Sequence, residues 1–111
     1  MNNLIIGDWI MKRITSLGQN YRVETYGLSE EQHDMVVEMV KNEEDAYGNY
    51  TLEDVDADML DAWIDNAKED GDTEYENFLA EAQLVDADVL VLTDHLGDFE
   101  QQIGEVVIYD C

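Results

Sequence analysis

The chain has 111 residues, of which 28 are acidic and 5 are basic, so its formal net charge is -23. A chain of this length forms one ordinary domain. Its hydrophobic content of 45%, with two Trp, six Tyr and two Phe, argues against an acidic disordered tail. The charge disfavours direct binding to nucleic acid and to anionic membranes, because both would repel the chain.

The acidic excess is distributed unevenly. Residues 1–27 carry two acids and three bases, whereas residues 28–111 carry 26 acids with only Lys41 and Lys68. The apolar run Leu4–Ile6 is too short and too interrupted by charge to span a bilayer or to act as a secretory signal. The single cysteine, Cys111, cannot form an internal disulfide. We therefore expect a soluble cytoplasmic protein whose partner is basic.

Two structural predictions concern the N-terminal quarter. The segments 11–16 and 21–26 are β-compatible and flank a turn-rich connection, which favours a hairpin. The competing interpretation is a short helix from Trp9 to Leu17, capped by Asp8 and stopped by Gly18. Trp9 lies beside Ile5, Ile6 and Ile10, so this segment either joins the core or forms a homodimer contact.

Three helices are predicted in the middle of the chain. The first begins with a capping box between Ser29 and Gln32 and runs to about Tyr47, where Gly48 and Asn49 end it. The second runs from about residue 52 to residue 68, with Thr51 at its N-cap and Gly71 closing it. The third covers about residues 74–84.

Two strands follow the helices. Residues 89–93 are typical of a buried strand, and residues 105–110 are its expected antiparallel partner, joined by a loop or short helical turn over residues 94–104. The order ββ-ααα-ββ predicts an α+β fold. We expect a single domain in which an antiparallel sheet of N-terminal and C-terminal hairpins is covered on one side by about three central amphipathic acidic helices.

Rows of carboxylates on the predicted helices are the most informative feature. On the second helix the acids fall within a narrow arc and are three or four residues apart, which is about 4.5–6 Å of axial rise. The first helix adds a second row. The candidate partner-binding residues are Asp54, Asp58, Asp61, Asp65 and Glu69 on the second helix and Glu31, Asp34, Glu38 and Asp45 on the first.

Such rows approximate the charge density of a DNA strand, whose phosphates recur about every 3.4 Å along the axis. In character the chain is similar to the small acidic DNA-mimic inhibitors of phages and mobile elements, although it carries no family motif. That resemblance implies a competitive inhibitor of a basic DNA-binding protein of restriction, CRISPR, repair or nucleoid function. Two such rows on one side of a domain would imitate the strands that flank a groove.

Two alternatives remain open. An immunity protein or antitoxin against a basic nuclease would also be small and acidic, with tyrosines such as Tyr47, Tyr50 or Tyr75 as anchors. A surface adapted to high salt would need no dedicated partner.

No enzymatic, cofactor or metal site is predicted. His33 and His95 are far apart and lack Cys or His at metal-ligand spacing, and His33 is interpreted as a packing residue. The segment 66–77 resembles a calcium loop only at Gly71, since Lys68 stands at a coordinating position.

Overall fold

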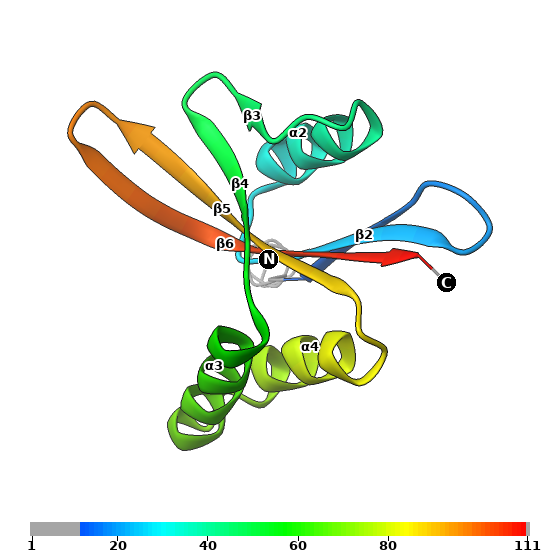
Figure 1. Ribbon diagram of the computed structural model, residues 1–111, viewed down its shortest axis with the longest axis vertical. Helices are drawn as coiled ribbons and strands as arrows, with labels where there is room; N and C mark the ends of the chain where they lie inside the picture. The colour runs from blue at the N-terminus through cyan, green and yellow to red at the C-terminus, as the bar shows by residue number, and fades with distance from the viewer. Residues whose placement is uncertain (1–11, 111) are drawn as a thin grey trace, which may run out of the picture.

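The computed structural model describes residues 12–110, which form one antiparallel six-stranded sheet in the order β1-β2-β6-β5-β4-β3 with three helices packed on it (Figure 1). The α+β class and the antiparallel sheet are therefore confirmed. The elements are β1 (Lys12–Ser16), β2 (Tyr21–Tyr26), α2 (Glu30–Lys41), β3 (Ala46–Tyr47), β4 (Tyr50–Asp54), α3 (Ala57–Asp70), α4 (Thr73–Leu84), β5 (Asp88–Leu96) and β6 (Phe99–Asp110). The predicted homodimer segment around Trp9 lies outside the described residues.

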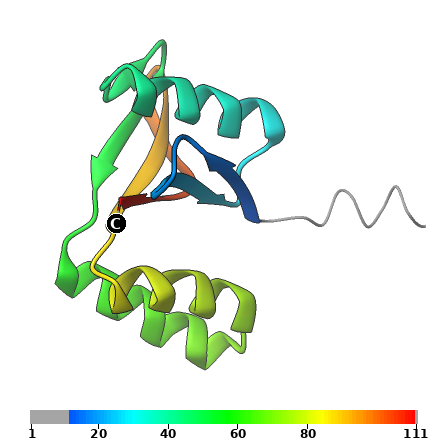
Figure 2. The ribbon, with the colours of Figure 1, turned by 90° about the vertical axis from the view of Figure 1, so that its right-hand side faces the viewer.

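The helices cover both faces of the sheet rather than one. Helix α2 lies on one face, and α3 and α4 lie together on the other (Figures 1 and 2). Strand β6 contributes to both cores because successive side chains of a strand point to opposite faces. Val106 packs with α2, and Val107 packs with α3 and α4. No helix within residues 12–110 is long and apolar enough to cross a membrane.

The N-terminal hairpin is confirmed, and the alternative helix is wrong over residues 12–16. Strands β1 and β2 pair in a register that runs from Lys12 opposite Tyr26 to Ser16 opposite Arg22. The β-branched and aromatic residues of both strands suit a pleated sheet. Strand β2 also pairs with β6 along its other edge, so the hairpin is part of the main sheet.

The first helix begins where predicted but ends earlier. Ser29 and Gln32 form the capping box, with hydrogen bonds of 3.1 and 2.9 Å. The helix stops at Lys41, because the run of acids that follows is exposed and would lie unfavourably at the negative end of the helix dipole. Gly48, with φ of 59°, serves a small β3–β4 hairpin instead of ending a helix.

The second helix begins later than predicted. Residues 50–54 form strand β4 on β5, so Thr51 is not an N-cap. The cap is Asp56, whose carboxylate accepts a 2.8 Å hydrogen bond from the Met59 backbone N–H. Asp is a better N-cap than Thr, and Leu52 points into the α2 core with strand periodicity. The termination at Gly71 and the third helix are confirmed.

The C-terminal strands are longer than predicted. Strands β5 and β6 stay paired to Leu96 opposite Phe99, so most of the predicted loop over residues 94–104 is a hairpin arm. This arm projects past the helices, so both of its faces carry polar side chains (Figure 1). The alternation of apolar and polar residues that marks a strand in the sequence is therefore missing there. A bulge lies opposite the step from Leu92 to Thr93.

His33 is a packing residue, as predicted. It is 4% exposed and forms 2.7 Å hydrogen bonds with Thr15 of β1 and Thr25 of β2. Burial lowers the pKa of His33 below its usual 6.5, outweighing the opposite influence of Asp34. The imidazole therefore joins α2 to the N-terminal hairpin in its neutral form.

Candidate functional site

Four of the five acids predicted on the second helix form a row on α3. Asp58, Asp61, Asp65 and Glu69 are exposed and follow one another at intervals of three or four residues, or about 4.5–6 Å of axial rise. We call these four residues the α3 row. Asp54 is not part of it, because this residue is the exposed last residue of strand β4.

The second predicted row is shorter and lies elsewhere. Glu31, Asp34 and Glu38 are exposed on α2, and Lys41 forms a 3.3 Å ion pair with Glu38. Asp45 lies in the connection between α2 and β3. Because α2 and α3 occupy opposite faces of the sheet, the two rows do not flank a common groove (Figures 1 and 2).

Helix α4 lies beside α3 and is also acidic. We call residues 56–86, which comprise both helices, their connection and their flanking caps, the acidic layer. It contains eleven acids and one base, Lys68. Its acids are Asp56, Asp58, Asp61, Asp65, Glu69, Asp70, Asp72, Glu74, Glu76, Glu81 and Asp86.

Little in the described part of the chain neutralises the acidic layer. Among residues 12–110, its one acid in an ion pair is Glu81, at 3.7 Å from Arg22. The side-chain amide of Gln83 donates a hydrogen bond to Asp61 and so ties α4 to α3. The α4 acids were missed from the sequence, because they form no narrow arc on their own helix. A count of charge over both helices would have found them.

Two of the three basic residues of β1 and β2, Lys12 and Arg22, pair with a buried carboxylate. Glu24 is 2% exposed, and Arg22 Nε donates to its Oε2 at 2.6 Å while Lys12 Nζ lies 3.5 Å from its Oε1. The hydrogen bond with Glu24 is the main cause that raises the pKa of Arg22. The Arg22 guanidinium also lies 4.0 Å above the centre of the Tyr109 ring. These charges are thus engaged at the sheet.

An open groove lies between the acidic layer and the sheet. It encloses about 240 Å³ and is lined by Trp63 and Asn66 of α3, Tyr75 of α4, and Gln102 and Glu105 of β6. We call it the aromatic groove. The Trp63 ring packs at the edge of the α3–α4 cluster while remaining partly exposed.

Glu105 has an unusual environment in this groove. Burial raises its pKa to about 7, although the hydrogen bond from the Tyr75 hydroxyl acts in the opposite direction. Burial is also the main cause that raises the pKa of Tyr75 above its usual value. One sequence signal was available, since Glu105 shares its strand face with Val107 and Tyr109, which are both buried.

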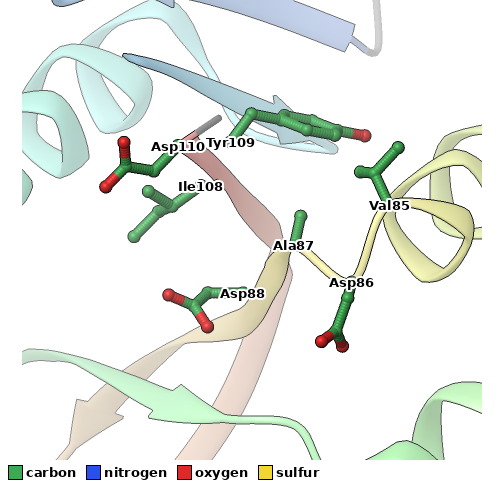
Figure 3. A pocket seen from close by; sticks show the side chains of 7 residues that line it. All are labelled: Val85, Asp86, Ala87, Asp88, Ile108, Tyr109 and Asp110. Atoms are coloured by element: carbon green, nitrogen blue, oxygen red, sulfur yellow. The ribbon is translucent and has the colours of Figure 1, made fainter. Parts of the chain in front are cut away.

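A second hollow lies beside the end of β6. Figure 3 shows the three carboxylates among its lining residues, and they point in different directions rather than toward a common centre. Within residues 12–110, no group of three or more His, Cys, Asp or Glu is arranged to hold a metal ion. The lining residues are Val85, Asp86, Ala87, Asp88, Ile108, Tyr109 and Asp110.

The tyrosines of the immunity-protein alternative are not brought together. Tyr47 and Tyr50 face each other across the β3–β4 pair, and Tyr50 packs on the α2 core. Tyr75 lies on the opposite face, where its ring centre is 5.1 Å from that of Tyr26. His95 is a strand residue that contacts Thr51 at 2.8 Å.

Comparisons with protein-family models, with curated proteins and with solved structures found no match for the chain.

Proposed function

We propose that this protein is a non-enzymatic DNA mimic that binds the basic DNA-binding surface of another protein through the acidic layer. The supporting observation is the layer itself, with eleven acids and a single lysine on two adjacent helices and the caps and connection that flank them. Its charge attracts a cationic cleft from a distance and speeds association. Phosphate contacts carry no sequence information, so the mimic needs only charge and spacing.

The cost of this arrangement favours a functional origin. Like charges three or four residues apart weaken a helix by about 0.2–0.5 kcal/mol per pair. The α3 row contains three such pairs, and an ordinary solvated helix relieves them with bases between the acids. Here Lys68 is the only base on α3.

We place the contact on α3 and α4 and not on α2. The two rows lie on opposite faces, so one flat partner surface cannot contact both at once. The row on α2, formed by Glu31, Asp34 and Glu38, is also shorter, and Lys41 neutralises part of it. A phage or mobile-element origin, a cytoplasmic location and a restriction, CRISPR, repair or nucleoid target belong to this proposal.

The test is capture of DNA-binding proteins from bacterial lysate on the immobilised protein, with elution by salt steps or by excess duplex DNA. We expect the immobilised protein to capture basic DNA-binding proteins, and we expect duplex DNA to displace them. The variant Asp58→Asn/Asp61→Asn/Asp65→Asn should lose this capture. The matched variant Glu31→Gln/Asp34→Asn/Glu38→Gln removes the same charge from α2 and should retain most of it.

The proposal would be contradicted if excess duplex DNA did not displace the captured proteins, or if both variants lost capture equally. A single partner that resists DNA and salt would favour the immunity-protein alternative. That alternative has one observation in its support, since the Tyr47 side chain is 60% exposed and available as an anchor. Alanine at Tyr47 should then weaken binding more than loss of any one carboxylate.

A further inference from the structure

We propose that the aromatic groove is a socket for an arginine side chain, and that the basic partner inserts one there. The second half of this statement rests on the proposed function, whereas the first half can be tested without any partner. The groove combines two aromatic side chains, two amides and one carboxylate, supplied by three different elements.

The size of the groove indicates a side chain rather than a whole small molecule. Sites for drug-sized ligands enclose about 300–1,000 Å³. The aromatic groove encloses about 240 Å³ and is open to solvent on one side. A long, narrow group that enters from a protein surface suits this shape.

The lining chemistry favours a guanidinium. Trp and Tyr rings attract cations to their faces, and a planar guanidinium also stacks on them. The carboxylate of Glu105 and the amide oxygens of Asn66 and Gln102 supply acceptors, and Arg has five N–H donors to satisfy them. Lysine has a compact, strongly hydrated charge and gains less from the aromatic walls.

The charges around the groove exclude an anionic ligand. No lysine or arginine is among the described residues that line it. Burial raises the pKa of Tyr26, the register neighbour of Glu105 on β2, and Asp72 and Glu74 at the start of α4 raise it further, so these two acids act on the same region. The local field therefore favours a cation.

Glu105 makes the socket sensitive to pH. A bound cation favours the ionised carboxylate, and the pKa of the free protein's Glu105 is about 7. The groups that face it are the Tyr75 hydroxyl from α4 and Tyr26 from β2, with Asp72 and Glu74 nearby. Binding of the cation should therefore strengthen as the pH rises from 6 to 8, and it should release protons.

The experiment uses N-acetyl-argininamide as the probe and NMR as the readout. The signals followed are the Trp63 indole N–H, assigned with the Trp63→Phe variant, and the side-chain amides of Asn66 and Gln102. We expect saturable shifts confined to these groups, with affinity about tenfold higher at pH 8 than at pH 6. The neutral probe N-acetyl-norleucinamide should give none.

Variants of β6 provide the matched comparison. Glu105→Gln should weaken the probe about tenfold at pH 8, as expected for loss of a charge-assisted hydrogen bond. Glu100→Gln removes the same charge from the same strand outside the groove and should leave binding unchanged. Trp63→Phe should weaken binding of the probe although Glu105 is unchanged, and the Gln102 amide signal follows the binding in this variant.

Two results would contradict the socket. One is probe-induced chemical-shift changes spread over all acidic surfaces, and the other is equal affinity of Glu105→Gln and Glu100→Gln for the probe. Failure of the proposed function looks different, because lysate capture would then be absent while the probe still binds. If capture occurs and is insensitive to Glu105→Gln, the partner does not use the socket and the second half of the proposal falls.

Discussion

The two faces of the sheet bury polar groups in different ways. On the α2 face, His33 is neutral and shares two hydrogen bonds with Thr15 and Thr25. On the α3–α4 face, Glu24 pairs with Arg22 and Lys12, and burial raises the pKa of Glu105. The face that carries the acidic layer thus also holds Glu24 and Glu105. A fall in pH should therefore destabilise the α2 face through His33, and a rise in pH should destabilise the α3–α4 face through Glu105.

The largest effect is expected where a buried charge loses its main partner. Arg22→Met would leave Glu24 with only Lys12, at 3.5 Å. Breaking a buried ion pair costs about 3–5 kcal/mol, and we expect about 3 kcal/mol because the Arg22 side chain is partly exposed. Urea unfolding measures the change.

The double variant Arg22→Met/Glu24→Leu is the control for this prediction. It removes both charges, so most of the lost stability should return. If the double variant is as unstable as Arg22→Met, loss of packing on Tyr109 is the cause and not the unpaired charge.

The next effect concerns the α2 face. His33→Leu removes two hydrogen bonds and leaves the buried Thr25 hydroxyl without its imidazole partner, at a cost of about 1–2 kcal/mol. Because the folded-state pKa of His33 is lowered, the neutral imidazole contributes stability above pH 6.5 that is lost as the pH falls below it.

Denaturant unfolding from pH 7.5 to pH 5 tests the histidine. The stability difference between the protein and His33→Leu should shrink toward the acidic end. A difference that stays constant over this range would show that His33 has an ordinary pKa in the fold.

Glu105 is expected to have a smaller effect on stability, with a pH dependence opposite to that of His33. Its folded-state pKa of about 7 lies above the unfolded value of about 4.3, so the carboxyl group costs stability as the pH rises through this interval. Glu105→Gln should therefore gain relative stability between pH 5 and pH 8 in thermal unfolding. Glu53→Gln, at an exposed carboxylate of β4, should show no such trend, and equal trends in both variants would assign the effect to net charge alone.

The smallest effect concerns the α3 row. Asp61→Asn/Asp65→Asn removes all three like-charge pairs of the row, and the amide oxygen introduced by Asp61→Asn can still accept from Gln83. Stability should therefore rise by about 0.5–1 kcal/mol in urea unfolding. Asp88→Asn/Asp98→Asn removes two charges from positions outside the helices and should change it less. If the first variant gains stability and loses partner capture, the row is maintained for binding at the expense of stability.

Local signals in the sequence predicted much of the fold. The capping box at Ser29, the stop at Gly71 and the β-branched hairpin strands depend on near neighbours, and all three were right. The start of the second helix was predicted wrongly because two patterns fitted equally well. Leu52 and Val55 suit a helix face, yet pairing of β4 with residues 90–94 of β5 decided the matter.

The candidate site was less predictable than the fold. Exposure of the α3 row follows from the helix wheel, but its separation from the α2 row depends on which face each helix covers. The aromatic groove joins Trp63 with Glu105 from distant parts of the chain, and only tertiary packing brings such residues together.

The central position of β6 has a consequence for how the chain folds. In the hydrogen-bonding order of the sheet, this strand is the link between the β1–β2 hairpin and the β3–β4–β5 portion, and it pairs Tyr21 with Asp110. Closing so long a loop is slow, because its entropy is lost before the contacts form. Unpaired strand edges are a hazard for association between chains, and mutual repulsion between chains of charge -23 opposes such association while the sheet is incomplete.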